Sequence, residues 1–153
     1  MYILGISCYY HDASAALLQD GKLVAAAEEE RFTRIKHDYD FPECAINFCL
    51  EYAGISVKDL DYIVFYEKPF HKFERILMTT LQSFPRSWVV FREAMIAWLS
   101  DKLWIKNTIS SKTGIEYNKI LFGDHHLSHA ASAFYPSPFQ EAILIVVCLS
   151  CIV

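Results

Sequence analysis

Three of the chain's six histidines lie close together in the segment 124–129, whose sequence is DHHLSH. On a helix, His125 and His129 stand four positions apart and project from one face, with Cβ atoms about 6 Å apart. Two imidazoles at this spacing can bind one metal ion, and a third ligand, usually a carboxylate, would come from elsewhere. His126 points about 100° away from them. The alternative is a helix N-terminus capped by Asp124 with surface histidines, and spacing alone leaves both interpretations open.

The turn between the first two apolar runs carries His11, Asp12 and Ser14. An imidazole, a carboxylate and a hydroxyl on one turn can perform general acid–base chemistry, or the turn can face a phosphate with its backbone N–H groups. The alternative is an ordinary polar turn in which Asp12 and Ser14 bond to nearby backbone groups. No glycine-rich phosphate motif accompanies these residues, so their types alone favour the ordinary turn.

Acidic and basic side chains are mixed in residues 28–38. Arg31, Arg34 and Lys36 could line an anion site, because the forked guanidinium suits phosphate. Charge-rich segments are more often solvated loops, and the residues of this segment alone favour that interpretation.

The elements that must position these residues alternate between strand-like and helix-like patterns. Asp20-Gly21 predicts a tight hairpin turn, and Pro42 and Gly54 suit the first turn of a helix and the position after its last. Residues 28–38 are expected to leave the sheet as a loop. The expected strands span residues 2–9, 13–18, 23–27, 62–66, 119–122 and 142–147, the last apolar enough for a central place in a sheet. The expected helices span residues 42–53, most of 69–83, 85–106 and 125–134.

This order of elements predicts an α/β fold with a mixed sheet. A three-stranded antiparallel meander comes first, and strands joined by crossover helices follow it. The pattern matches an actin-like, or ribonuclease H-like, lobe.

The composition is that of one folded domain of 153 residues with 54% hydrophobic residues, which excludes intrinsic disorder. The net charge of −4 argues against nucleic acid as a partner, because proteins that bind the phosphate backbone are usually basic. Charges interrupt the apolar segment 88–105, so no membrane span is expected. No basic segment of a signal peptide opens the chain and no pair of zinc motifs is present, so we expect a cytoplasmic protein with reduced cysteines.

Three long stretches are together similar to the O-carbamoyltransferases of the nodulation-factor and antibiotic-tailoring type. They are Ile3–Leu17, Ala27–His37 and Asp124–Pro138, and the resemblance runs from residue 2 to about residue 146. It implies an actin-like domain that transfers a carbamoyl group from carbamoyl-adenylate to a hydroxyl of a small-molecule acceptor. It also implies a C-terminal domain, absent from this sequence, that makes carbamoyl-adenylate from carbamoyl phosphate and ATP. A divalent metal ion is implied as cofactor, with iron expected first and zinc as the alternative.

The resemblance also implies roles for individual residues. His125 and His129 are implied as metal ligands, and His11 and Asp12 as candidate catalytic residues beside the carbamoyl-adenylate. With this resemblance, the anion-site interpretation of residues 28–38 ranks above the solvated loop. The residues expected to bind substrate or nucleotide at the rim are Glu30, Arg31 and Lys36.

Residues 147–153 depart from this family. Where the family has Asp-Gly, with the Asp as a metal ligand, this chain has Cys148 followed by Leu149. A cysteine could bind iron, but the missing glycine alters the phosphate-facing turn. We therefore expect a truncated first part of the domain, over residues 1–153, that is inactive alone. The alternatives are an inactive remnant, a subunit that a partner chain or self-association through the exposed terminal strand completes, and a stand-alone metal-binding domain.

Overall fold

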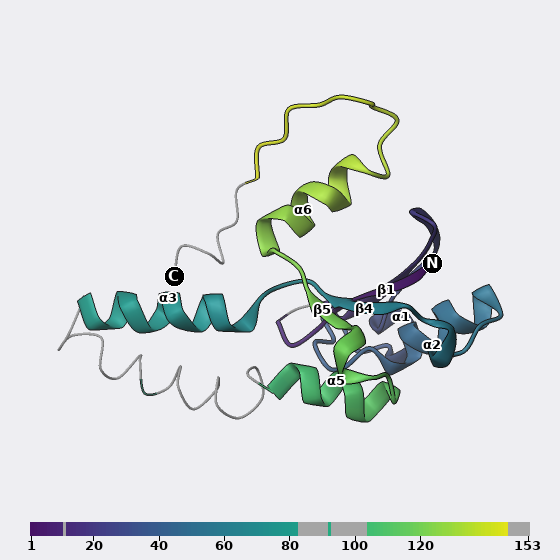
Figure 1. The fold of residues 1–153 in the computed structure, drawn as a ribbon, viewed down its shortest axis with the longest axis horizontal. Coiled ribbons are helices and arrows are strands. Elements are labelled where there is room, and N and C mark those ends of the chain that lie inside the picture. The colour runs from purple at the N-terminus through teal and green to yellow at the C-terminus, as the bar shows by residue number, and fades with distance from the viewer. Residues whose placement is uncertain (11, 83–91, 93–103, 147–153) are drawn as a thin grey trace.

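The structure is a computed structural model, and it describes residues 1–10, 12–82, 92 and 104–146 (Figure 1). A mixed α/β architecture is confirmed. The elements are β1 (Tyr2–Ser7), β2 (Ser14–Gln19), β3 (Lys22–Glu28), α1 (Glu30–Thr33), α2 (Glu43–Ala53), β4 (Tyr62–Phe65), α3 (Pro69–Gln82), α5 (Ile105–Thr113), β5 (Ile120–Phe122) and α6 (His125–Phe134), with 3-10 helices at Val57–Asp59 and Tyr117–Lys119.

The five strands form one mixed sheet in the order β3-β2-β1-β4-β5. The hairpins β1–β2 and β2–β3 are antiparallel, and the second turns at Asp20 and Gly21, both of which have the positive φ that such a turn needs. β1 pairs in parallel with β4, and β4 with β5, which requires the crossover segments that carry the helices. The carboxyl ends of β1, β3, β4 and β5 therefore share one edge of the sheet with the start of β2.

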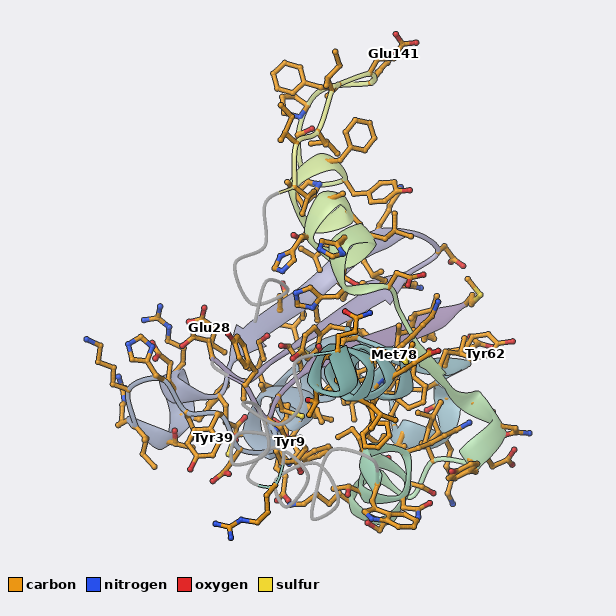
Figure 2. The ribbon with its side chains drawn as sticks, turned by 90° about the vertical axis from the view of Figure 1, so that its left-hand side faces the viewer. Tyr9, Glu28, Tyr39, Tyr62, Met78 and Glu141 are labelled. Carbon is orange, nitrogen blue, oxygen red and sulfur yellow. The ribbon has the colours of Figure 1, made fainter. Side chains whose placement is uncertain are left out.

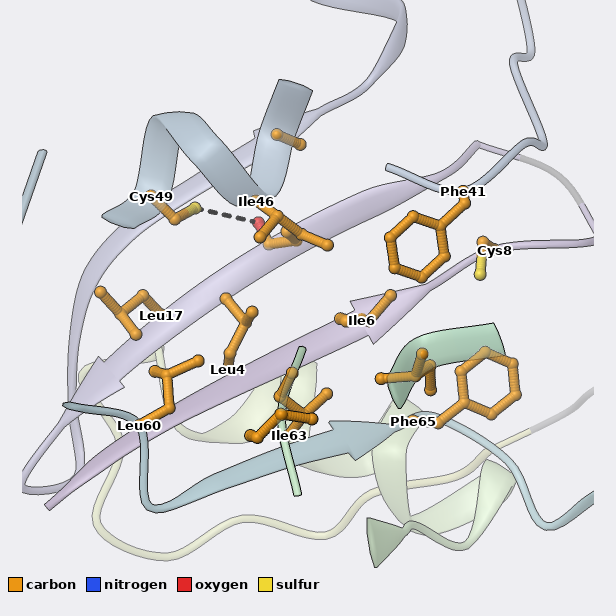
Figure 3. Packing of buried hydrophobic residues seen from close by; sticks show 14 of the residues in the cluster. Leu4, Ile6, Cys8, Leu17, Phe41, Ile46, Cys49, Leu60, Ile63 and Phe65 are labelled. Atoms are coloured by element: carbon orange, nitrogen blue, oxygen red, sulfur yellow. Dashed lines mark hydrogen bonds between the residues drawn. The ribbon is translucent and has the colours of Figure 1, made fainter. Parts of the chain in front are cut away.

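The core lies on one face of this sheet. Side chains alternate between faces along a strand, so Leu4, Ile6 and Cys8 point into the core together with Ile63 and Phe65 (Figure 3). Helices α2 and α5 cover this face, while α6 lies on the other side of the sheet (Figure 1). The buried helical residues that close the core are Ala45, Ile46, Cys49, Leu50, Ile105 and Ile109.

Helix α2 begins and ends where the sequence predicts. It starts after Pro42, and Gly54 ends it in the left-handed conformation with a φ of 66°. The first N–H groups of a helix have no partner within it. Here the carboxylate of Glu29 accepts hydrogen bonds from the backbone N–H groups of Cys44 at 3.0 Å and Ala45 at 2.7 Å. Glu29 is only 4% exposed, so this buried carboxylate ties the end of β3 to the start of α2.

Three predictions for local structure need correction. Residues 28–38 are not entirely loop, because the short helix α1 forms within them. Residues 142–146 form no strand, and Ile143 is 94% exposed, because an apolar run becomes a strand only where another strand pairs with it. The expected helix over 85–106 ends too early, since α5 runs from Ile105 to Thr113, and most of the expected range lies outside the described residues, as does Cys148. Within the described part of the chain, no helix is long and apolar enough to cross a membrane.

The buried carboxylate of Glu29 generates a first prediction. Replacing Glu29 with alanine removes the acceptor for two N–H groups, so we expect the free energy of unfolding to fall by about 2–3 kcal/mol. Urea denaturation followed by circular dichroism measures the loss. The matched control is Glu28→Ala, because Glu28 is exposed and its contact with Arg31 is a 3.5 Å surface pair, which predicts a change below about 0.5 kcal/mol. Equal losses in the two variants would contradict the role of Glu29.

A second prediction concerns Cys8, which follows β1 and is 1% exposed. Burial raises the pKa of this thiol to about 12, with a smaller lowering by Lys112 and a smaller raising by Asp40. Because only the thiolate reacts, iodoacetamide at pH 8 should leave Cys8 unmodified in the folded protein and alkylate it in urea. The raised pKa favours the protonated thiol in the folded state, so its contribution to stability is present below the ordinary thiol pKa and is lost at higher pH.

Peptide mass mapping separates Cys8 from the other cysteines in this experiment. Cys44 is the internal reference, because it is exposed in the folded protein. Alkylation of Cys8 at the rate of Cys44 without denaturant would show that the thiol is neither buried nor protonated as described.

Candidate functional site

All the segments that carry candidate residues leave the sheet at the same edge. Residues 8–13 join β1 to β2, residues 29–38 follow β3, Tyr66–Lys68 follow β4, and residues 123–129 follow β5. In open α/β sheets, ligands bind outside the carboxyl ends of the strands. β1 is adjacent to β4, and neighbouring strands lie about 5 Å apart, so the first turn and the segment after β4 are close neighbours.

His125 and His129 are brought together on the first turns of α6. Their Nε2 atoms lie 3.2 Å apart, and their ring centroids are 4.7 Å apart with the planes nearly perpendicular. His126 lies beside His125 with a ring-centroid distance of 5.8 Å. The two Nε2 atoms thus converge on one point, as the helical spacing predicts.

This convergence fits the donor set of a metal site. Two imidazole nitrogens bound to one ion at about 2.0–2.1 Å, with an angle between 90° and tetrahedral, lie about 2.9–3.4 Å apart. The 3.2 Å between the Nε2 atoms of His125 and His129 is within that range, and it also suits a hydrogen bond between the two rings. Among the described residues, no group of three or more His, Cys, Asp and Glu side chains forms a complete ligand set. The structure therefore describes half of such a site, and the ligand role of the two histidines stays a prediction.

A buried carboxylate that the sequence analysis missed lies beside this pair. Glu67 is 8% exposed, and its Oε2 is 3.7 Å from Nδ1 of His125, on the opposite side of the ring from the Nε2 that faces His129. The ring of Tyr66 lies beside the same imidazole, with 5.6 Å between the centroids and the planes tilted by 55°. Burial raises the pKa of the Tyr66 hydroxyl above its ordinary value, and the charge of Glu67 adds to the rise. The available signal was position, since Tyr66 ends a predicted strand and Glu67 directly follows it.

Hydrogen bonds fix α6 against the end of β4. The hydroxyl of Ser128 donates to the backbone carbonyls of Tyr66 at 3.1 Å and of Asp124 at 3.0 Å. Gly123 N–H donates to the carbonyl of Phe65 at 2.8 Å. Asp124 occupies the N-cap position as predicted, but its side chain makes no capping hydrogen bond to the helix. Its carboxylate instead forms an ion pair with Lys68 at 2.8 Å, and so joins the two segments again.

A second cluster forms where residues 8–13 meet residues 29–39. Asp12 Oδ1 lies 2.9 Å from Nδ1 of His37, and the backbone N–H of His37 donates to Glu30 Oε2 at 3.2 Å. The structure thus joins two of the candidate residues, Asp12 and Glu30, through a histidine that was not a candidate. Backbone hydrogen bonds hold the two segments in contact, including the one from Tyr9 N–H to the carbonyl of Tyr39 at 2.7 Å (Figure 2).

The backbone of these two segments is unusual. Of the described non-glycine residues, five have a positive φ, and four of them lie here. Residues other than glycine rarely adopt this conformation, which costs of order 1–3 kcal/mol each and concentrates at functional sites. The four residues are Tyr9, Asp12, Arg34 and His37.

The remaining candidate residues are less constrained. Arg31 is exposed, forms the 3.5 Å pair with Glu28, and lines an open hollow of about 570 Å³ beside β2 and β3. Lys36 is exposed as well. His11 lies outside the described residues. The structure therefore brings Asp12 and Glu30 into one hydrogen-bonded cluster and leaves Arg31 and Lys36 exposed.

A small cavity connects the first turn with the segment after β4. It has a volume of about 10 Å³, and its lining includes Cys8, Tyr9 and Glu67. Glu67 therefore stands between the turn that precedes Asp12 and the histidine pair on α6. The two clusters therefore border a common edge of the sheet.

Comparison with known proteins identifies the pattern. A family model described as carbamoyltransferase N-terminus matches residues 2–152. The uncharacterised protein sll1178 of Synechocystis sp. is 55% identical over 152 residues, covering 94% of this chain and 25% of that protein. Nodulation protein NolNO of Sinorhizobium fredii is 36% identical over 141 residues, covering 91% of this chain and 19% of NolNO. The uncharacterised protein MJ1051 of Methanocaldococcus jannaschii is 30% identical over 143 residues, covering 94% of this chain and 21% of that protein.

This chain therefore spans a quarter or less of the length of these three relatives. The family match, in contrast, extends over nearly the whole chain and includes every segment at the carboxyl edge of the sheet. The resemblance drawn from the three sequence stretches is confirmed, and the chain belongs to the carbamoyltransferase N-terminal family.

Proposed function

We propose that this chain is a segment of a carbamoyltransferase that transfers a carbamoyl group from carbamoyl-adenylate to a hydroxyl of a small-molecule acceptor. The observation that carries the proposal is the convergence of Nε2 of His125 and Nε2 of His129, 3.2 Å apart, at the carboxyl edge of the sheet in a member of this family. The metal, ATP, carbamoyl phosphate and the acceptor are part of the proposal.

We further propose that the sheet is the first part of an actin-like, or ribonuclease H-like, lobe. The support is the antiparallel meander β1–β2–β3 followed by two strands parallel to β1, with helices in the crossovers. In such a lobe the nucleotide would be bound outside the carboxyl ends of the strands, which is where the candidate residues lie.

The transfer forms a bond between the acceptor oxygen and the carbamoyl carbon, and it breaks the bond from that carbon to the adenylate phosphate. The acceptor hydroxyl loses its proton and AMP leaves. A bound metal ion would supply a Lewis acid that polarises a carbonyl or phosphoryl oxygen. In this chain, His125 and His129 would hold the ion. His11 is proposed to take the acceptor's proton or to stabilise the departing adenylate.

The second cluster would position that chemistry. Asp12, held by its 2.9 Å contact with His37, fixes the turn next to His11 in sequence. Glu30 accepts the N–H of His37 and so holds the same loop from the other side. Arg31 and Lys36, exposed beside this cluster, are proposed to attract the phosphate of the adenylate, because charged donors suit a phosphate group.

Metal binding tests the proposal directly. The purified chain should bind about one equivalent of Fe²⁺ or Zn²⁺ by titration against a chelator. His125→Ala and His129→Ala should each weaken binding by more than about 100-fold, since loss of an outer partner alone costs about 10–100-fold. His126→Ala is the matched control on the same helix and should retain the affinity. Unchanged affinity in His125→Ala or His129→Ala would overturn the assignment.

A second candidate function is that of a subunit completed by a partner chain. The observation that favours it is the exposed apolar surface after α6, where Ile143 is 94% and Ile145 is 86% exposed. Large apolar patches of this kind mark surfaces that another part of a protein or a partner covers.

Complementation measures this second function. The chain should gain carbamoyl transfer when it is mixed with the part of the Synechocystis relative that lies beyond the matched region. The assay follows radiolabelled carbamoyl phosphate into product in the presence of ATP, and Ile143→Lys with Ile145→Lys is expected to abolish the gain. Transfer by the chain alone at the same rate would show that no partner is needed.

A further inference from the structure

Glu67 holds an unusual place for a glutamate. It comes two residues after the end of β4, at the carboxyl edge of the sheet, and its side chain is only 10% exposed. Burying a carboxylate is costly unless charges or hydrogen-bond donors compensate for the lost water. The groups that face it include the hydroxyl of Tyr66 and the imidazole of His125, whose own side chain is 16% exposed. A buried acid against a partly buried imidazole indicates a functional contact more than a chance surface pair.

The two nitrogens of His125 face different partners. Nε2 lies 3.2 Å from Nε2 of His129, and Nδ1 lies 3.7 Å from Oε2 of Glu67. An imidazole binds a metal only through an unprotonated nitrogen, so the proton of a neutral metal-bound ring must be on the other nitrogen. Histidine ligands almost always direct that second N–H at a carboxylate, a carbonyl or water, which fixes the ring's tautomer and orientation.

His129 lacks the corresponding carboxylate among the described contacts, so the two histidines are not equivalent. The Nε2 atom of the His129 ring faces Nε2 of His125. Glu67 faces Nδ1 of His125 and not the two Nε2 atoms that converge. Its position is therefore that of an outer partner to one ligand and not that of a third ligand.

We propose that Glu67 is a positioning residue that keeps His125 protonated on Nδ1 and so presents its Nε2 lone pair to the metal beside His129. The inference rests on the proposed function, because it requires that the histidine pair binds a metal. At 3.7 Å the carboxylate is in ion-pair range and beyond the length of a hydrogen bond, so a modest rotation of either side chain completes the contact.

Glu67 also lines a small cavity beside the first turn. Cys8 and Tyr9, at the start of the first turn, line the same small cavity as Glu67. Glu67 thus faces His125 and lies near the start of the turn that leads to the candidate catalytic residues.

The test compares four forms of the full chain: wild type, Glu67→Gln, Glu67→Asp and the control Glu51→Gln. Glu51 is an exposed glutamate on α2, on the opposite face of the sheet from α6. We expect Glu67→Gln to weaken Zn²⁺ binding by about 10–100-fold, Glu67→Asp to restore part of that loss, and Glu51→Gln to bind like wild type. Circular dichroism confirms that each variant is folded. Wild-type affinity in a folded Glu67→Gln would overturn the inference.

A second readout does not depend on metal or on a variant that folds. The ¹⁵N chemical shifts of the His125 ring in the metal-free wild type report which nitrogen carries the proton. We expect the Nδ1–H tautomer, and a dominant Nε2–H tautomer would overturn the inference even if Glu67→Gln binds metal weakly.

The outcomes separate this inference from the function on which it rests. If His125→Ala and His129→Ala lose the metal while Glu67→Gln keeps it, the metal site stands and the role of Glu67 falls. If the wild type binds no Zn²⁺ or Fe²⁺, both the metal-site assignment and the inference fail. Weaker binding in all three variants, with the Nδ1–H tautomer in the wild type, supports both.

Discussion

The central place of β1 is the constraint on which the other features depend. It pairs with β2 in an antiparallel manner on one side and with β4 in parallel on the other. This double pairing directs the carboxyl ends of four strands to one edge. A different neighbour for β1 would scatter the segments that now meet there. The histidine pair, the buried Glu67 and the cluster of Asp12 with His37 are therefore consequences of one topological choice.

The two sides of the edge are held by different means. Polar contacts anchor α6 to the end of β4, through Ser128, Gly123 and the ion pair between Lys68 and Asp124. The loop after β3 is anchored by a buried acid, Glu29, that reaches the start of α2. One side thus depends on hydrogen bonds at the surface and the other on a carboxylate within the protein. Because the second anchor reaches the hydrophobic core, the loop that follows it is tied to the packing of the whole lobe.

Much of this arrangement could be read from the sequence. Alternating apolar residues indicated the meander, Asp20-Gly21 its turn, and Pro42 and Gly54 the limits of α2, because each of these signals is local. The i, i+4 spacing also indicated that His125 and His129 would converge. The apolar run at 142–147 predicted a strand that residues 142–146 do not form. Hydrophobicity reports a preference for burial and not the presence of a pairing strand. Local sequence patterns could not predict the contact of Glu67 with His125 or that of Asp12 with His37. The two residues of each pair are 58 and 25 positions apart in the chain.

The burial of Cys8 affects which chemical groups the carboxyl edge of the sheet can offer to a metal ion. Cys8 lines the cavity that Glu67 also lines, and its pKa is raised to about 12. A thiol is a strong ligand for soft ions such as Cu⁺ only as the thiolate, and this one stays protonated at neutral pH. Burial of this sulfur in the core therefore leaves the start of the first turn without a thiolate ligand at neutral pH.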